Sequence, residues 1–249
     1  MLLLSGRLGR EIWGEEARQA EALVQELGYL PLALELAAAQ VEDGLSWGVL
    51  LEDIQGEVAR LKTLDRPWAR DVVDEASLKR LSLTASLNLS LKRLDPETRE
   101  GFIWLGILPE DVNITQGMTA VLWDMDDERD ARDELGYLRS KALLLDGVAL
   151  SDGKKSYRLH DLFHHLARNL LSAPLKPRRR GALAGLGIGL AEAHGIFLEK
   201  YRRLTDNYLW HTLPDDGYIH QHLVWHFERA GMIGDIHGLL GEESKSGAN

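Results

Sequence analysis

The 249-residue sequence contains no cysteine and no long apolar run. The first absence excludes disulfide bonds and thiolate zinc sites within this chain, which fits a reducing compartment. The opening residues, MLLLSG, are too short for the core of a signal peptide or for a membrane span. We therefore expect a cytoplasmic chain without a membrane partner.

The sequence is also short of positive charge, because 29 Lys and Arg residues stand against 39 Asp and Glu residues, a net charge of -10. A field of this sign repels polyanions, so composition argues against a general binder of nucleic acid or of anionic membranes. Leu and Ala are abundant and β-branched residues are few, in a chain that is 45% hydrophobic and 27% charged. This balance is typical of a globular, mainly α-helical protein.

A third absence is the phosphate loop, since no G-x-x-x-x-G-K-[ST] pattern occurs and residues 6–10, GRLGR, do not form one. Phosphoryl transfer needs the lysine and the magnesium-binding hydroxyl of such a loop, or their equivalents. We therefore predict no catalytic residue, no enzymatic activity and no cofactor bound by this chain alone.

Residues 1–75 read as helices joined by short turns. One helical stripe runs over 15–27, and Gly28 can end it. Pro31 suits the first turn of a second helix, whose residues 32–39 are apolar nearly all round and predict burial on most sides. Ser46 is a candidate N-cap for a third helix to about residue 64, and 65–68, DRPW, indicates a linker.

Residues 76–172 are more regular. Leucines between 78 and 91 predict one helix, and Asp95 followed by Pro96 predicts the start of the next. Thr115 can cap a helix toward residue 122, and a further helix fits 127–141. The stretches 143–150 and 156–159 then predict a β-hairpin. Helices followed by a hairpin indicate a winged-helix domain with the hairpin as its wing.

Residues 173–249 predict the start of a C-terminal helical domain. We expect its core to hold five aromatic residues: Tyr201, Tyr208, Trp210, Trp225 and Phe227. The predicted fold class is mainly α: a helical bundle, a winged-helix domain with a small β-hairpin wing, and a further helical domain.

The stretch 157–168, YRLHDLFHHLAR, passes directly from a β-like to a helical pattern, with Leu162, Leu166 and Leu170 on one helical face. We predict Asp161 as the N-cap of this helix, which leaves His160 beside a helix N-terminus where anions are favoured. The alternative for His160 is a surface histidine that a neighbouring carbonyl satisfies.

Three stretches resemble a known family. Residues 27–36, LGYLPLALEL, are similar to the GLPLAL motif of the NB-ARC (AP-ATPase) branch of the STAND signalling NTPases. Residues 94–114 resemble that family's winged-helix entry, and Leu159, His160 and Asp161 resemble its MHD motif. Their order and spacing also match, over about the first 170 residues. Residues 213–226 resemble more loosely the helical domain of Apaf-1-like members.

Two departures and one omission qualify the match. Leu159 replaces the methionine of the MHD motif, a swap of similar volume that should keep the packing. Tyr29 stands where the family often has a small or polar residue, and the phosphate loop is missing. The resemblance thus implies the regulatory half of a larger NTPase, with an ARC1-like helical region over 1–75 and an ARC2-like winged helix over 76–172. Such a chain would be a fragment or a split gene product.

The resemblance also implies roles for individual residues in the parent protein. Pro31 would lie against the nucleotide base, and His160 would reach the β-phosphate of ADP and hold the resting state. Gly28, Leu30, Leu159 and Asp161 would support the two motifs. The implied cofactors are ADP and ATP with magnesium. The implied partners are an intramolecular nucleotide-binding domain, downstream sensor repeats and, on activation, further copies of the protein.

The alternative to a signalling switch is a winged-helix DNA-binding transcription regulator. In that case the helix at 115–122 would enter the major groove. That stretch contains no Arg or Lys, so phosphate anchoring would be poor.

Two other clusters have alternative interpretations. His222 with His226, and His160 with His164, have the spacing of metal-binding pairs, but no carboxylate completes a ligand set, so packing and surface roles are expected and no metal is predicted. The basic residues of 174–180 fit a solvated linker better than a polyanion site.

Overall fold

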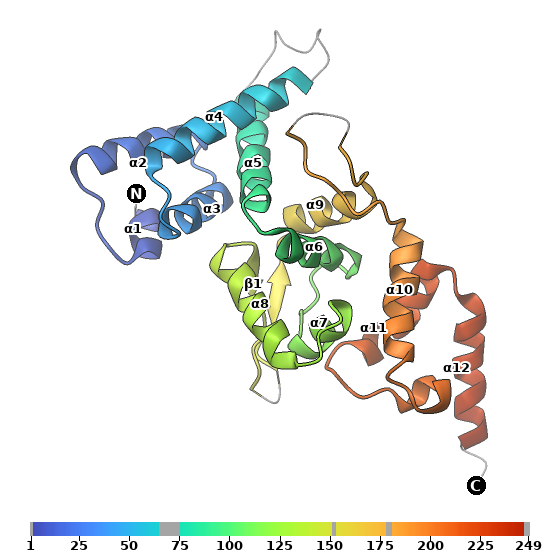
Figure 1. Ribbon diagram of the computed structural model, residues 1–249. Coiled ribbons are helices and arrows are strands. Elements are labelled where there is room, and N and C mark those ends of the chain that lie inside the picture. The colour runs from blue at the N-terminus through green and yellow to red at the C-terminus, as the bar shows by residue number, and fades with distance from the viewer. Residues whose placement is uncertain (1, 65–74, 151–152, 178–180, 247–249) are drawn as a thin grey trace. The chain divides into compact units, whose positions relative to one another are not determined.

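The computed structural model describes residues 2–64, 75–150, 153–177 and 181–246 (Figure 1). Within these residues the chain is mainly helical, with one two-stranded antiparallel sheet, which confirms the predicted fold class. The chain divides into two compact units. The first comprises Met1–Asp95 with Ser140–Ala142, and the second comprises Pro96–Arg139 with Leu143–Asn249.

The first unit consists of helices: α1 Leu2–Leu8, α2 Gly14–Glu26, α3 Pro31–Glu42, α4 Trp47–Leu64 and α5 Glu75–Lys92. Helix α3 begins at its proline and is buried along most of its length, as its continuous apolar sequence predicts. Helices α1 and α5 both pack on it, and α4 packs between α2 and α5. The predicted linker at 65–68 lies outside the described residues.

Helix α5 departs from its predicted leucine face. Leu87 and Leu91 are buried, but so are Ser82, Ser86 and Ser90, whereas Leu78 is exposed. The other leucines of the helix, Leu81, Leu83 and Leu89, are only partly buried. The Ser86 and Ser90 hydroxyls donate to the carbonyls four residues earlier, each at 2.9 Å. Ser90 Oγ also accepts from the buried Gln40 side chain at 3.1 Å. Small, internally satisfied serines therefore lie in the core beside the leucines.

The second unit contains the following helices and strands: α6 Pro96–Trp104, η2 Leu105–Ile107, α7 Gln116–Leu122, α8 Glu128–Ser140, β1 Leu144–Asp146, β2 Tyr157–Leu159, α9 Asp161–Ser172, α10 Leu190–Arg202, η3 Asp206–Tyr208, η4 Trp210–Thr212, α11 Ile219–Ala230 and α12 Ile233–Ser246. Thr115 caps α7 as predicted, because its side chain accepts from the Met118 N–H. Strands β1 and β2 form the predicted hairpin, with Leu144 opposite Leu159. A bridge between Ile114 and Tyr157 adds a third extended segment, which completes a winged-helix arrangement.

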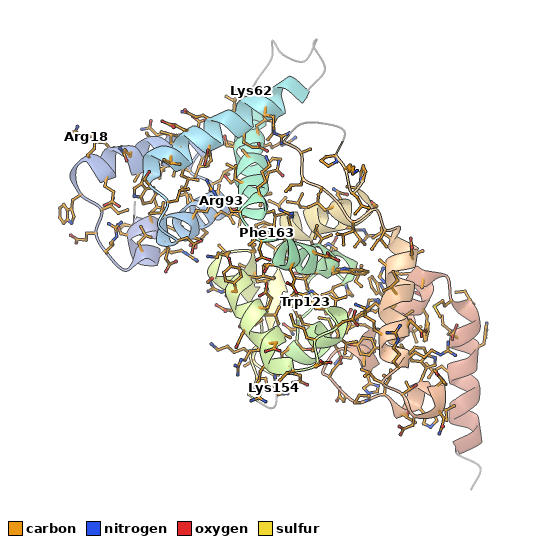
Figure 2. All side chains as sticks on the ribbon, viewed as in Figure 1. Arg18, Lys62, Arg93, Trp123, Lys154 and Phe163 are labelled. Carbon is orange, nitrogen blue, oxygen red and sulfur yellow. The ribbon has the colours of Figure 1, made fainter. Side chains whose placement is uncertain are left out.

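The winged helix is organised around α9. Phe163 of α9, labelled in Figure 2, lies inside this unit. It meets Phe102 of α6 edge to face at 5.7 Å, and both side chains are fully buried. Gly106 lets η2 lie directly on α9, because a Cβ there would come within 2.5 Å of the Arg168 backbone nitrogen. The backbone of η2 therefore approaches α9 more closely than a side chain would permit.

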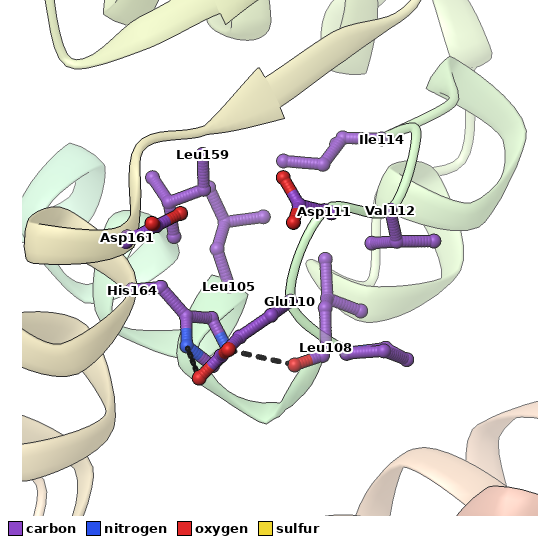
Figure 3. A pocket seen from close by; sticks show the side chains of 10 residues that line it. Leu105, Leu108, Glu110, Asp111, Val112, Ile114, Leu159, Asp161 and His164 are labelled. Carbon is purple, nitrogen blue, oxygen red and sulfur yellow. Dashed lines mark hydrogen bonds and ion pairs between the residues drawn. The ribbon is translucent and has the colours of Figure 1, made fainter.

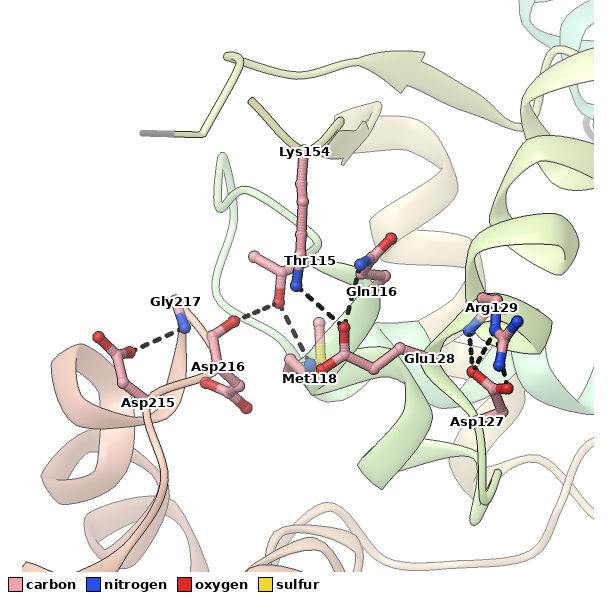
Figure 4. Close-up of polar contacts among 10 residues, drawn as sticks. All are labelled: Thr115, Gln116, Met118, Asp127, Glu128, Arg129, Lys154, Asp215, Asp216 and Gly217. Atoms are coloured by element: carbon pink, nitrogen blue, oxygen red, sulfur yellow. Dashed lines mark hydrogen bonds and ion pairs between the residues drawn. The ribbon is translucent and has the colours of Figure 1, made fainter. Parts of the chain in front are cut away.

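The C-terminal helices join the winged helix through both ends of α7. At its start, the Thr115 hydroxyl donates to the Asp216 carbonyl at 2.9 Å (Figure 4). At its end, Lys200 Nζ donates to the Leu122 carbonyl at 2.6 Å and pairs with Asp124 at 2.8 Å. Asp216 also accepts from the Tyr201 hydroxyl. Helix α10 and the loop before α11 are thus tied to the winged helix by part-buried polar contacts.

Two sequence predictions need correction in this unit. Tyr208 is 65% exposed and Trp225 is only half-buried, whereas Tyr201, Trp210 and Phe227 are buried as predicted. Tyr208 has a φ of 62° in a tight loop, and this backbone turns its ring outward from the core.

The second correction concerns the helix that would enter DNA. The pair α7 and α8 precedes the hairpin, so α8 rather than 115–122 is the second helix of the pair.

The compact units do not coincide with the three regions predicted from the sequence. Helix α5 joins the first unit because it packs on α3 and α4, and residue 172 lies inside the second unit. The boundaries near residues 75 and 172 therefore remain predictions of where one folding domain ends and the next begins. Among the described helices, none is both long enough and apolar enough to cross a membrane.

Candidate functional site

The GLPLAL-like stretch forms the turn between α2 and α3. Gly28 and Tyr29 both adopt positive φ angles, 61° and 60°, directly after the C-cap of α2. A side chain at Gly28 would meet the Lys79 side chain at 2.7 Å, so glycine fits this position on two grounds. Pro31 is the exposed first residue of α3, and Leu30 is its N-cap. The structure thus brings Gly28, Leu30 and Pro31 together in one turn.

The MHD-like stretch lies at the junction of β2 and α9. The predicted N-cap, Asp161, is wrong: the N-cap is His160, whose Nδ1 accepts from the Leu162 N–H at 3.2 Å. His160 has the extended backbone of a cap, φ −68° and ψ 141°, and Asp161 is the first helical residue. Asp161 is exposed in the first turn, where its negative charge is favourable toward the helix dipole.

The cap fixes the tautomer of His160. Nδ1 can accept from a backbone N–H only through its lone pair, so the proton of the neutral ring resides on Nε2. The ring is partly exposed. It therefore offers one N–H donor, on the side away from the helix backbone. Leu159, 8% exposed, pairs with Leu144 and holds the strand end in place.

The buried face of α9 is shifted from the predicted one. Leu162 is exposed, while Phe163, His164 and Ala167 face the core together with Leu170 and Leu171. The phenylalanine and the histidine therefore point inward, in place of the first leucine of the predicted face. Sequence reasoning noted His164 only for its four-residue spacing from His160.

His164 lines a small pocket between α9 and the loop after η2 (Figure 3). The side chain is 3% exposed, and its Nε2 meets the Leu108 carbonyl at 2.8 Å. The pocket volume is about 10 Å³, roughly one water molecule. The lining residues are Leu105, Leu108, Pro109, Glu110, Asp111, Val112, Ile114, Leu159, Asp161 and His164. Such a pocket is far too small for a nucleotide, and His160 is not among its lining residues.

The histidines of the C-terminal segment take part in a buried hydrogen-bond chain. His226 Nδ1 lies 2.8 Å from His194 Nδ1, and the Tyr218 hydroxyl lies 2.7 Å from His226 Nε2. Burial lowers the pKa of His194 to about 4, with Arg168 and Arg229 nearby adding to the effect. Burial, together with His194 and His222, lowers the pKa of His226 to about 2. Both rings are therefore neutral packing groups near neutral pH.

The two histidine pairs with metal-like spacing, His160 with His164 and His222 with His226, are not arranged as metal sites. His160 is engaged as a cap and His164 by the Leu108 carbonyl, while His226 bonds to His194 and Tyr218. Across the described stretches, no group of three His, Cys, Asp or Glu side chains has an arrangement suited to a metal ion. The basic residues Arg178, Arg179 and Arg180 lie outside the described residues.

The predicted site residues fall in two groups. Gly28, Leu30 and Pro31 belong to the first compact unit, and Leu159, His160 and Asp161 belong to the second. Each group is preorganised by its own local backbone: a left-handed turn in the first, and a strand end leading into a capped helix in the second.

The chain is similar in sequence to a known regulatory protein. No protein-family model matches the chain. The regulatory protein AfsR of Streptomyces griseus is 30% identical over 193 residues, which cover 76% of this chain and 18% of AfsR. The chain therefore spans less than a fifth of the length of that relative.

Proposed function

We propose that this chain is the regulatory half of a nucleotide-dependent signalling switch of the NB-ARC type. Two observations support the proposal: the similarity to a regulatory protein over most of the chain, and the GLPLAL-like and MHD-like stretches in preorganised turns. In this proposal, an upstream phosphate-loop domain binds ADP or ATP with magnesium. The helices and winged helix described above respond to which nucleotide is bound.

The observation that carries the proposal is the geometry of His160. Its Nδ1 is occupied by the Leu162 N–H, so its Nε2–H is the group that remains to donate to a ligand. A nucleoside diphosphate supplies an anionic phosphate oxygen. A hydrogen bond from a side chain to such an oxygen contributes roughly 1.5–3 kcal/mol. The exposed first turn of α3 offers Pro31 as an apolar surface for the base.

A contact of this size can bias a two-state equilibrium. If the phosphate meets His160 only in the closed arrangement, ADP favours the closed state by the free energy of that contact. Exchange for ATP, or loss of the contact, would release the winged helix and expose surfaces for assembly with further copies. The chain's own residues bind and orient the nucleotide in this scheme, and they carry out no chemistry.

The first test uses the chain alone and a fluorescent ADP analogue, followed by anisotropy. We expect no saturable binding and no ATP hydrolysis, because the chain has no phosphate loop. The same chain preceded by an NB-ARC phosphate-loop domain should bind ADP saturably. Tight ADP binding by the chain alone, abolished by a substitution within it, would overturn the proposal.

The DNA-binding alternative gains no support from the geometry. Helix α8, which precedes the hairpin, carries Glu128 and Asp130 in its first turn. Its arginines Arg129 and Arg132 pair with Asp127 and Asp133, so their positive charge is offset where the helix would meet a phosphate backbone. Sequence-specific DNA binding that weakens steeply with added salt, in an anisotropy titration, would revive this alternative.

A further inference from the structure

The pocket beside α9 contains two hydrogen-bond acceptors that face each other without a donor between them. His164 Nε2 must carry the ring proton, because its neighbour at 2.8 Å is the Leu108 carbonyl, which can only accept. In the neutral ring, His164 Nδ1 is therefore a bare lone pair. It is buried, has no hydrogen-bond partner, and lies 3.7 Å from Glu110 Oε1. A buried polar atom without a partner is uncommon in proteins and indicates a missing donor.

The surrounding side chains add negative charge and no donor. Asp161 lines the same pocket, and neither it nor Glu110 forms an ion pair with a Lys or Arg among the described residues. Asp111 is already paired with Arg158. The polar side chains left for a ligand are thus the Glu110 and Asp161 carboxylates and the His164 nitrogen. All three accept hydrogen bonds, so the complementary group is a cation with several N–H donors.

Size and apolar lining narrow the choice of cation. A volume of about 10 Å³ admits a group the size of water, which an ammonium is and a planar guanidinium is not. Most of the remaining wall is apolar and consists of Leu105, Leu108, Pro109, Val112, Ile114 and Leu159. Such a wall suits the methylene stem of a lysine, which packs along apolar surface while its head meets charge. The net charge of -10 also favours a basic partner.

We propose that this pocket binds the ε-ammonium of a lysine on a protein partner, held between His164 Nδ1 and the carboxylates of Glu110 and Asp161. The Glu110 side chain is 59% exposed, so it can turn outward to admit the ligand. Hydrogen bonds of normal length to both acceptors need the two atoms about 5 Å apart, a shift that one side-chain rotation provides. His160 is not among the residues that line this pocket, so the proposal can be tested on the chain without nucleotide.

The test follows the His164 Nδ1 resonance by two-dimensional ¹H–¹⁵N NMR of the full chain at constant pH and ionic strength. The probe is N-acetyl-lysine methylamide. We expect a saturable shift of Nδ1 toward the hydrogen-bonded value. The double variant Glu110→Gln/Asp161→Asn should bind about tenfold more weakly or worse, because it removes both charges without changing side-chain shape. Asp130→Asn removes an exposed charge elsewhere in the same unit and should bind as the unmodified chain does.

Two further probes separate the alternatives. The trimethylated lysine derivative keeps the stem and the charge but has no N–H on its head, so it should leave Nδ1 unchanged. Ammonium chloride lacks the stem and should bind more weakly than the lysine derivative. An unchanged Nδ1 with lysine, or an equal response to the trimethylated probe, would overturn the proposal. Ammonium binding as tight as lysine binding would show a site for a small cation and would overturn the lysine assignment.

Discussion

At the scale of single residues, the proposed switch gives His160 two roles that are usually separate. One ring nitrogen caps a helix, and the other carries the proton that a phosphate oxygen would accept. The cap holds the donor in a fixed direction, so little side-chain freedom is lost when a ligand binds. Substitutions that keep one role and remove the other can separate the two.

The capping role predicts a difference between His160→Ala and His160→Ser. Alanine leaves the Leu162 N–H without its partner and should lower the free energy of unfolding by about 1 kcal/mol. Serine is a good N-cap, so its effect on stability should be much smaller. Chemical denaturation of the two variants and the unmodified chain measures the difference. Asp161→Ala is the matched control and should cost only about 0.3–1 kcal/mol, since Asp161 interacts with the helix dipole and is not the cap. A loss on Asp161→Ala larger than that of His160→Ala would contradict this assignment.

The buried hydrogen-bond chain of His194, His226 and Tyr218 predicts that the folded protein becomes less stable at acidic pH. The folded-state pKa values of His194 and His226, about 4 and about 2, lie below the usual value for histidine, near 6.5. Below that usual value the unfolded chain takes up protons that the folded chain does not. Stability should therefore be constant above about pH 7 and fall as the pH drops from about 6.5 toward 4. The slope is at most about 1.4 kcal/mol per pH unit for each histidine.

Thermal unfolding measured between pH 7.5 and 5 checks this expectation. Carboxylates do not interfere in this range: those with a lowered pKa, such as Glu57 at about 2, lose their stabilising contribution only below about pH 4.5. His226→Gln should reduce the slope of stability against pH. His220→Gln, an exposed position on the same helix, is the control and should not change it. Identical slopes for the His226 variant and the unmodified chain would refute the account.

At the scale of elements, α9 is the helix on which the second unit is built. Its start is capped by His160. Its end is satisfied by the segment at 185–188, whose N–H groups donate to carbonyls of Leu170, Leu171, Ala173 and Pro174 at 2.8–3.1 Å. The orphan carbonyls at the helix end are thus paired by a chain that passes directly over them. That passage requires a residue without a side chain at its closest point.

The passage over α9 predicts opposite effects for two glycine-to-alanine changes. A Cβ at Gly185 would overlap the carbonyl oxygens of Leu170 and Ala173, so Gly185→Ala should destabilise the chain by about 1–3 kcal/mol. Gly195 lies inside α10 with open space around its Cα. Gly195→Ala should therefore stabilise by about 0.5–1 kcal/mol, through helix propensity. Urea midpoints of the two variants give the comparison, and equal shifts of the same sign would rule out the close contact.

Sequence signals that act within a single helical turn predicted the ends of helices well. Thr115, Pro31 and Gly28 each specify a helix end through their own backbone or side-chain chemistry, and each occupies that role in the structure. Leucine periodicity was less reliable. On α9 and α5 the buried face includes His164 and the serines, because tertiary packing selected polar residues that hydrogen-bond to backbone carbonyls. A periodicity analysis counts apolar residues only, so it cannot predict that a polar side chain will find a hydrogen-bond partner in the core.

At the scale of the molecule, the winged helix and the C-terminal helices belong to one compact unit. Lys200 and Asp216 attach α10 and the loop before α11 to the two ends of α7. The sequence predicted a separate C-terminal region because the contacts that join it to the winged helix lie 78 and 101 residues apart in the chain. The predicted site residues were placed in their turns by motif resemblance, but the His164 pocket was not foreseen. It depends on a loop 56 residues earlier.

The central claim is that His160 senses a nucleotide phosphate, and ADP dissociation tests it most directly. The protein joins this chain to an NB-ARC phosphate-loop domain and is loaded with fluorescent ADP, which is then chased with unlabelled ADP in a stopped-flow instrument. His160→Ser keeps the cap of α9 and removes the imidazole donor. We predict that ADP leaves this variant about 10–100 times faster than the unmodified protein, the equivalent of a lost hydrogen bond to a charged group. Equal dissociation rates in a protein that binds ADP would contradict the claim and leave His160 a helix cap alone.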